Sequence, residues 1–288
     1  MNAAPPDSGD RGVGAEGRSL IVDGLDIYLR DEGQGSPLLL LHGFPFTHHS
    51  FRAVLEPLAR RHRVLALDLP GFGNSARPPA FAYDVVAYAD AMAALLRQVG
   101  AAPAAAIAHG LGAAVAVAMA VLQPGTLCRL VLVSPTIHAQ PLSILARLAS
   151  RDGLIGAWLF RRAFTRERLA RRLRRDVYRD PATADDELVD RVWEPLRRPG
   201  GLDAARRVVG TMASLDAIAE LPPRLACPSL VVSGEDDRIV SPRRARLLAA
   251  EIPGSRAVTV AACGHCPHEE RPAEFLEAVM PFLDEERG

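Results

Sequence analysis

Short apolar segments and amphipathic segments alternate along most of this chain, and this alternation restricts its possible folds more than any other feature. Residues 37–43 and 63–69 are apolar runs of strand length, and residues 50–61 between them repeat apolar side chains at the period of a helix. A helix pattern at 85–100 and a strand pattern at 104–108 continue the series. The alternation predicts an α/β fold whose mostly parallel, doubly wound sheet carries helices on both faces.

The alternation is interrupted once, in the second half of the chain. From residue 137 to about residue 220 the pattern is helical only, and a strand pattern returns at 228–234. We therefore expect a helical cap at 137–220, inserted into an α/β core made of residues 19–136 and 221–288. Ligands bind at the carboxyl edge of such sheets, so the cap is expected to lie over that edge.

Two short signals predict where individual elements begin or turn. Asp23 and Gly24 stand between two strand-like segments and predict the turn of a β-hairpin. Ser241 followed by Pro242 predicts the start of a helix, because serine caps the first N–H groups and proline suits the first helical turn.

The first 18 residues are polar, are rich in glycine and proline, and lack the apolar segment of a secretory signal. We expect a disordered tail at 1–18 and a cytoplasmic protein. The longest apolar run, near residues 111–122, is shorter than the roughly 20 residues that a membrane-spanning helix needs.

The balance of charges narrows the possible partners. The 34 basic and 34 acidic residues give a formal net charge of zero, which argues against a nucleic acid or a membrane surface as the main partner. All basic residues are arginines, so a Schiff base on a lysine is excluded. The sequence does not predict the oligomeric state.

Cysteine and histidine spacing indicates neither a metal site nor a cofactor. Cys263 and Cys266 form a C-x-x-C sequence of the kind found in redox proteins, but Pro267 and the acidic residues after it do not resemble the helix that normally follows. The spacing of cysteine and histidine matches no common zinc pattern. We expect no metal and no cofactor.

Four loops, each placed just after a predicted strand, contain the candidate catalytic residues. Their sequences are HGFP at 42–45, AHGLG at 108–112, GEDD at 234–237 and CGHCPHEERP at 263–272. In this order the chain resembles the α/β-hydrolase-fold superfamily of lipases, epoxide hydrolases and haloalkane dehalogenases. DLPGFGNS at 68–75 is similar to that family's loop after its fourth strand. The resemblance covers roughly residues 19–286, including a helical cap.

The resemblance implies a role for each matching position. His265 matches the catalytic histidine, and Asp237, with Asp236 as its rival, matches the acid that orients it. The backbone N–H groups of Phe44 and Leu111 match the oxyanion hole.

Three further residues are assigned to the surroundings of the substrate. His42, His109 and Trp158 are expected around the substrate pocket, His42 also as a structural residue of its own loop. Trp158, Trp193 and the leucines and phenylalanines of the cap favour a small or medium hydrophobic substrate.

Gly110 departs from the family pattern. The family places serine or aspartate at this turn, whereas glycine accepts the strained backbone without supplying an attacking atom. Ser75, Ser134 and Ser233 are poor substitutes because none lies at a turn that begins a helix.

Three hypotheses therefore remain open. In the first, the His265–Asp237 dyad is a general base that works without a covalent nucleophile, through proton abstraction, elimination or activation of water. In the second, the chain is a serine ester hydrolase whose nucleophile has been replaced by Gly110. In the third, it is a non-catalytic protein that keeps the pocket for binding.

One feature of the cap has two interpretations. Residues 161–179 carry nine arginines and two acidic residues, Glu167 and Asp176. The arginines are either a solvated helix face or a patch for an anionic substrate.

Overall fold

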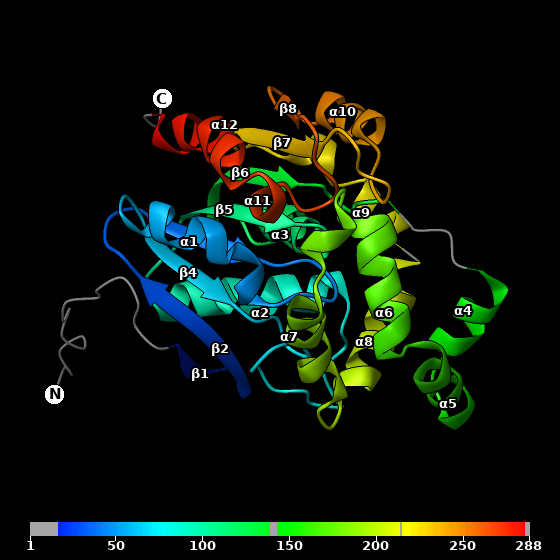
Figure 1. The fold of residues 1–288 in the computed structure, drawn as a ribbon. Coiled ribbons are helices and arrows are strands. Elements are labelled where there is room, and N and C mark those ends of the chain that lie inside the picture. The colour runs from blue at the N-terminus through cyan, green and yellow to red at the C-terminus, as the bar shows by residue number, and fades with distance from the viewer. Residues whose placement is uncertain (1–16, 139–142, 214, 286–288) are drawn as a thin grey trace, which may run out of the picture.

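The computed structural model describes residues 17–138, 143–213 and 215–285, and its framework is one eight-stranded sheet (Figure 1). The strand order is β1-β2-β4-β3-β5-β6-β7-β8. The pairs β1–β2 and β2–β4 are antiparallel, and all pairs from β4 to β8 are parallel, which confirms the predicted mostly parallel sheet. The strands are β1 (Arg18–Val22), β2 (Leu25–Glu32), β3 (Pro37–Leu41), β4 (Arg63–Leu67), β5 (Ala104–His109), β6 (Leu127–Val133), β7 (Ser229–Gly234) and β8 (Arg256–Val260).

Helices cover both faces of this sheet, as predicted. Phe51, Leu58 and Phe275 belong to an apolar cluster under α1 and α12, and a second cluster on the other face includes Leu96 of α2 and Val115 of α3. The helices around the sheet are α1 (Arg52–Ala59), α2 (Val85–Gln98), α3 (Leu111–Leu122), α10 (Pro242–Glu251), α11 (Pro267–Glu270) and α12 (Pro272–Asp284). Short helical turns are η1 (His48–Phe51), η3 (Pro181–Thr183) and η4 (Pro222–Arg224).

The centre of the sheet explains why the apolar runs of the sequence form strands. The leucines of β3 from Leu38 to Leu41 are all fully buried, as expected for a central parallel strand with helices on both faces. α3 packs closely beside it, and a Cβ at Gly112 would lie only 2.5 Å from the carbonyl oxygen of Leu41. A glycine at this position therefore allows α3 to approach β3.

The two local signals noted in the sequence are also confirmed. Val22 pairs with Leu25 across the Asp23–Gly24 turn of the β1–β2 hairpin. The Ser241 hydroxyl accepts a hydrogen bond from the Arg244 N–H at 3.4 Å, and α10 begins at Pro242.

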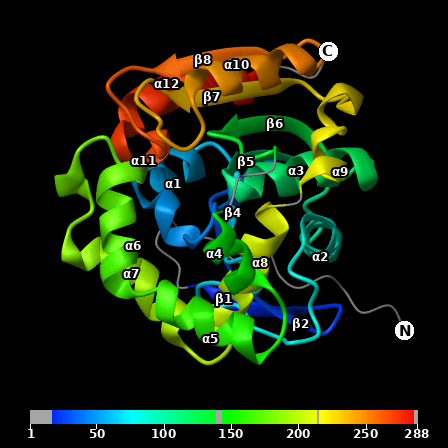
Figure 2. The same ribbon diagram turned by 90° about the vertical axis from the view of Figure 1, so that its right-hand side faces the viewer.

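Between β6 and β7, the described residues form helices and turns with no strand (Figure 2). These elements are α4 (Ile144–Ser150), α5 (Leu154–Ala163), α6 (Arg166–Arg172), the π-helical turn η2 (Leu173–Val177), α7 (Asp186–Arg197), α8 (Gly201–Met212) and α9 (Asp216–Ala219). We refer to α4 through α8 as the cap; its limits at residues 137 and 220 stay a prediction.

The predicted tail overlaps the first strand. β1 begins at Arg18, which pairs with Leu29, because an amphipathic residue at the edge of a hairpin can extend the ladder. Residues 1–16 of the predicted tail lie outside the described residues. In the ranges that the structure describes, no helix combines the length and the apolarity required to span a bilayer.

Candidate active site

The loops after β3, β5, β6, β7 and β8 meet at the carboxyl edge of the sheet. The Gly110 N–H donates to the carbonyl of Val133 at 3.0 Å, and the Thr136 N–H donates to the carbonyl of Gly110 at 3.1 Å. The Asp236 N–H donates to the carbonyl of Cys263 at 2.8 Å, which joins the loops after β7 and β8. Parallel strands bring these distant segments together because their carboxyl ends point the same way.

His265 and Asp237 form a buried pair in this edge. Nδ1 of His265 lies 2.9 Å from Oδ2 of Asp237, while Oδ1 of Asp237 accepts the N–H groups of Ile239 at 2.8 Å and Val240 at 2.9 Å. Burial by itself would raise the pKa of Asp237. The opposite effect of His265 and the two N–H groups is larger, so the pKa lies below its usual value. The carboxylate therefore accepts the Nδ1 proton of His265, and the lone pair of the ring lies on Nε2.

Asp236, the rival to Asp237, is placed differently. Its carboxylate accepts Nε of Arg179 at 2.6 Å, and 42% of its side chain is exposed. The adjacent acid therefore forms an ion pair with the chain segment after η2 rather than an interaction with the histidine.

The backbone around His265 is fixed from two sides. The His265 N–H donates to the carbonyl of Val177 in η2 at 2.7 Å, so a cap residue holds the histidine loop. From the core, Oε1 of Glu270 accepts the N–H groups of Gly264 at 3.0 Å and Cys266 at 3.3 Å. Sequence reasoning assigned no role to Glu270, although its position five residues after His265 in an acidic run was visible.

Gly110 has the backbone of a sharp turn between β5 and α3. Its φ is +52° and its ψ is −113°, a conformation that costs a residue with a side chain about 1–3 kcal/mol. A Cβ at Gly110 would lie 3.5 Å from Cα of Gly43, 3.8 Å from Nε2 of His265 and 3.9 Å from Oγ1 of Thr136. These are ordinary van der Waals distances, so Nε2 of His265 lies where it could reach a short side chain at position 110.

Thr136 is a residue of this edge that sequence reasoning missed. Its side chain is buried, and its hydroxyl lies close to the Cβ position of Gly110 on a different element from His265. Thr136 lies two residues after Ser134, in the loop that follows β6. This position could have indicated it, because residues at the carboxyl ends of parallel strands gather at this edge.

Two backbone N–H groups near Gly110 have no acceptor among the residues that the structure describes. They belong to Phe44, in the loop after β3, and to Leu111, the first residue of α3. The first N–H groups of a helix are without intrahelical partners and carry a partial positive charge. Both groups are therefore free to donate to an anionic oxygen.

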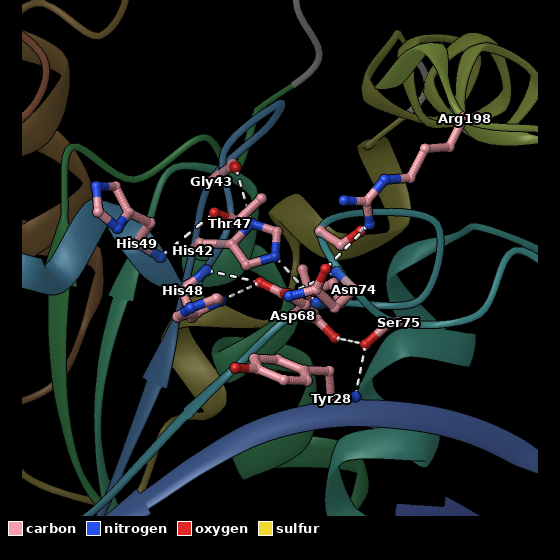
Figure 3. Close-up of polar contacts among 12 residues, drawn as sticks. Tyr28, His42, Gly43, Thr47, His48, His49, Asp68, Asn74, Ser75 and Arg198 are labelled. Atoms are coloured by element: carbon pink, nitrogen blue, oxygen red, sulfur yellow. Dashed lines mark hydrogen bonds and ion pairs between the residues drawn. The ribbon is translucent and has the colours of Figure 1, made fainter. Parts of the chain in front are cut away.

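A buried carboxylate secures the loop that carries Phe44 (Figure 3). Oδ1 of Asp68 accepts the backbone N–H and Nδ1 of His48, both at 2.8 Å, and its Oδ2 accepts the N–H of Asn74 at 2.8 Å. Although burial raises the pKa of Asp68, the bonds from His48 and Asn74 lower it to below its usual value. Asp68 therefore ties the loop after β3 to the loop after β4.

His42 is part of the same scaffold. Its Nε2 accepts the N–H of Leu69 at 2.9 Å, which places the ring proton on Nδ1, 3.0 Å from the carbonyl oxygen of Gly43. Burial is the main cause of a lowered pKa, so the ring is neutral. Both nitrogens are thus engaged with the backbone.

His109 and His268 form a buried group with His265. The His109 ring centroid lies 4.8 Å from each of the other two, and its Nε2 donates to the carbonyl of His265 at 3.1 Å. Burial, followed by the neighbouring histidines, lowers the pKa of His109 well below its usual value. Burial also lowers the pKa of His268 to about 3. His109 is therefore a neutral ring, and its hydrogen bond supports the backbone of His265.

Trp158 is not placed as the sequence predicts. Its side chain is 60% exposed on α5, with the guanidinium carbon of Arg162 at 5.6 Å from its ring centroid. The physical reason is the orientation of α5, whose packed side carries Gly156 and Phe160 instead. His42, His109 and Trp158 therefore do not come together as the lining of one pocket.

The other side chains that could attack a substrate, three serines and Cys266, are not placed as nucleophiles in the described structure. The Ser75 hydroxyl donates to the carbonyl of Asp68 at 2.5 Å, and the Ser233 hydroxyl lies 3.5 Å from that of Thr259. Ser134 is buried, without a hydrogen-bond partner for its hydroxyl. Burial is the main reason that the pKa of Cys266 lies well above its usual value, so the thiol is not ionised at neutral pH.

Aromatic side chains connect the loop after β3 to the cap. The ring of Phe44 meets Phe72 at a centroid distance of 5.8 Å and Phe164 of the cap at 6.2 Å. Phe164 in turn stacks on Phe160 at 5.1 Å and Trp193 at 6.4 Å. An apolar environment therefore adjoins the free N–H of Phe44.

No metal centre is evident in the described part of the chain. Across residues 17–138, 143–213 and 215–285, no three histidine, cysteine, aspartate or glutamate side chains are grouped so as to hold a metal ion.

Comparison with known proteins gives consistent results. A model of the alpha/beta hydrolase family matches residues 38–278. A 2-hydroxymuconate semialdehyde hydrolase from Pseudomonas sp. (strain CF600) is 28% identical over 280 residues, which cover 93% of this chain and 94% of that protein.

Two solved structures support the same relationship. Cfl2 from Burkholderia cenocepacia superposes with a TM-score of 0.79 at 27% identity, covering 93% of this chain and 95% of the other. A thermophilic esterase from Thermogutta terrifontis superposes with a TM-score of 0.73 at 26% identity, covering 93% of this chain and 98% of the other.

Proposed function

Because the chain belongs to the alpha/beta hydrolase family, we propose that it is an enzyme acting on a small to medium hydrophobic molecule, with the His265–Asp237 dyad as general base. No covalent serine nucleophile takes part in this proposal. The observation that carries it is the geometry at Gly110: Nε2 of His265 lies 3.8 Å from the Cβ position of a residue that has no side chain. A base so placed serves a substrate proton or a water molecule.

Activation of water is the version that the surrounding groups support best. A water molecule beside Gly110 could donate to Nε2 of His265 and bond to the Thr136 hydroxyl, which lies 3.9 Å from the same Cβ position. His265 takes one proton from the water as its oxygen bonds to the carbonyl carbon of an ester. The carbonyl oxygen becomes an alkoxide, and the N–H groups of Phe44 and Leu111 stabilise it. The carbonyl then re-forms as the bond between this carbon and the ester oxygen breaks, and His265 gives its proton to that leaving oxygen.

The ionised Asp237 has two tasks in this sequence of steps. It keeps the proton of neutral His265 on Nδ1, so that Nε2 is the base, and it stabilises the imidazolium that forms. General-base assistance of this kind contributes about 10²–10⁴ in rate. Phe44, Phe164 and Trp193 supply apolar and aromatic surface for a hydrophobic substrate.

A second candidate is a serine ester hydrolase in which glycine has replaced the nucleophile. The observation in its favour is that a Cβ at position 110 meets no atom closer than 3.5 Å, so the site accepts a serine side chain. Under this hypothesis the dyad and the free N–H groups are inherited parts of a triad and the chain itself turns over no ester.

The test compares the chain as it stands with His265→Ala and Asp237→Asn. Two substrates are used: p-nitrophenyl butyrate, and 2-hydroxymuconate semialdehyde, which the Pseudomonas relative is named for. We expect slow turnover that falls by about 10²–10⁴ in each variant. Intact-protein mass spectrometry during turnover should detect no acyl adduct. Rates equal to those of His265→Ala with both substrates would reject the proposal for these reactions, and an acyl adduct would reject the mechanism.

A further inference from the structure

The two cap helices α4 and α5 expose most of the large apolar side chains found on the surface of the described chain. Ten such side chains are exposed, and six of them lie between residues 144 and 158. The exposed fractions are 81% for Ile144, 57% for Leu145, 41% for Leu148, 90% for Leu154, 78% for Ile155 and 60% for Trp158. We call this set the α4–α5 surface. Monomeric soluble proteins rarely leave so many large apolar groups together in water without a binding role.

The exposure follows from how the two helices are anchored. Arg206 of α8 is buried, and its guanidinium donates to the carbonyls of Ser150 at 3.0 Å and Arg151 at 2.6 Å and to Asp152 at 3.1 Å. A Cβ at Gly156 would lie 2.0 Å from the carbonyl oxygen of Arg151, so glycine lets the start of α5 fold tightly back on α4. These contacts hold α4 and α5 against α8 (Figure 2).

The charged residues between 143 and 163 are four arginines and one aspartate. Arg147, Arg151, Arg161 and Arg162 are exposed, and none forms an ion pair with another described residue. Asp152 is the one acidic residue between 143 and 163, and it shares the guanidinium of Arg206 with Asp203. Figure 1 shows α4 and α5 projecting from the body of the molecule, clear of the sheet. The zero net charge of the whole chain thus conceals a locally cationic and apolar surface.

We propose that the α4–α5 surface binds the face of an anionic phospholipid bilayer. Isoleucine, leucine and tryptophan on helices that lie along a membrane enter the acyl boundary, and arginines pair with lipid phosphates. A second copy of this chain is a poorer occupant, because two such surfaces face to face would bring unpaired arginines together. This inference goes beyond the proposed function and does not depend on it.

The test uses Trp158 as a reporter. The chain has two tryptophans, so Trp193→Phe leaves Trp158 alone, and the full-length variant is mixed with vesicles of palmitoyl-oleoyl-phosphatidylglycerol or of the matching phosphatidylcholine. With phosphatidylglycerol we expect the emission of Trp158 to shift to shorter wavelength and to be quenched by brominated acyl chains. Sedimentation of the unaltered chain with the same vesicles gives a second, independent measurement.

Matched variants distinguish binding through the α4–α5 surface from non-specific binding of the protein to vesicles. Leu154→Ser combined with Ile155→Ser should weaken partitioning into phosphatidylglycerol vesicles at least about tenfold, since both side chains are almost fully exposed and their loss leaves the core intact. Leu247→Ser, which removes an exposed leucine from α10, should leave partitioning unchanged. Arg161→Gln combined with Arg162→Gln should remove the preference for the anionic lipid.

Two outcomes would overturn the proposal. One is absence of binding to phosphatidylglycerol vesicles, or binding that the Leu154→Ser, Ile155→Ser variant retains in full. The other is a concentration-dependent dimer, measured by light scattering, that the same variant abolishes, because the surface would then serve a second copy of the chain.

Discussion

Replacing Gly110 with serine measures how well the rest of the site is arranged for nucleophilic attack. The Cβ of the new side chain would lie 3.8 Å from Nε2 of His265 and no closer than 3.5 Å to any other atom. A hydroxyl oxygen about 1.4 Å beyond that Cβ can then come within the roughly 2.6–3.2 Å that proton transfer to the base requires. Gly110→Ser should therefore assemble a working triad with His265 and Asp237.

Both the gain in activity and the loss of stability can be estimated. The N–H groups of Phe44 and Leu111 and the base His265 are present before and after the change, so the gain comes from holding the nucleophile in place. An effective molarity of about 10⁵ M for a well-oriented group, against about 55 M for water, corresponds to roughly 10³ in the rate of p-nitrophenyl butyrate hydrolysis. The backbone at φ +52° should at the same time lower the free energy of unfolding by about 1–3 kcal/mol.

The assay is the initial rate and burst phase of p-nitrophenolate release, with urea unfolding for stability. Gly110→Ala is the matched control, because it carries the same backbone strain and supplies no nucleophile. The serine variant should show an acyl-enzyme by mass spectrometry, and adding His265→Ala should abolish its gain. If Gly110→Ser is no faster than Gly110→Ala, the dyad and the N–H groups are not arranged for nucleophilic attack at position 110.

Three further predictions concern buried groups of the same region. Burial lowers the pKa of His268 to about 3, so from about pH 6.5 down to pH 3 the unfolded chain binds a proton that the folded chain does not, and stability falls with pH. His268→Phe should therefore be more stable than the unaltered chain by about 2 kcal/mol at pH 5 and close to it at pH 8, measured by urea unfolding. Asp68→Ala should lower the free energy of unfolding by about 3–5 kcal/mol, because the N–H groups of His48 and Asn74 lose their buried acceptor; unchanged urea curves would contradict this. If His265 activates water as proposed, Thr136→Val should slow turnover by the unaltered chain by about three- to tenfold, the equivalent of one hydrogen bond, and should leave Gly110→Ser unaffected because its attacking oxygen is covalently held.

The fold could be predicted from the sequence because its signals are local and repeated. The run of leucines in β3 indicates a buried central strand, and the small apolar residues of α3 indicate a buried helix. Gly112 allows the two to pack closely. His265 and Asp237 were assigned through the resemblance to the α/β-hydrolase fold, which the four loops after the strands carry, and parallel strands place those loops at one edge.

The environment of α5 could not be predicted, because it depends on a residue far away in the chain. The helix has apolar side chains on more than one side, and its amphipathic pattern does not say which side is covered. Arg206, in α8, binds the turn between α4 and α5, and in the helix that follows this turn Phe160 is buried and Trp158 exposed. The role of Thr136, and the contacts of Asp68 at the start of the DLPGFGNS loop, were not predicted either, because they depend on contacts across loops rather than on a local pattern.

The contacts of the Phe44 ring connect the cap to the proposed oxyanion hole. The ring contacts Phe72 of the core and Phe164 of the cap, and the backbone N–H of the same residue is expected to donate to a negatively charged oxygen. If a movement of the cap separated Phe164 from Phe44, the ring of Phe44 would lose one of these two contacts. Under the proposed function, the contact between Phe44 and Phe164 therefore links the position of the cap to the support of the N–H group that is expected to stabilise negative charge.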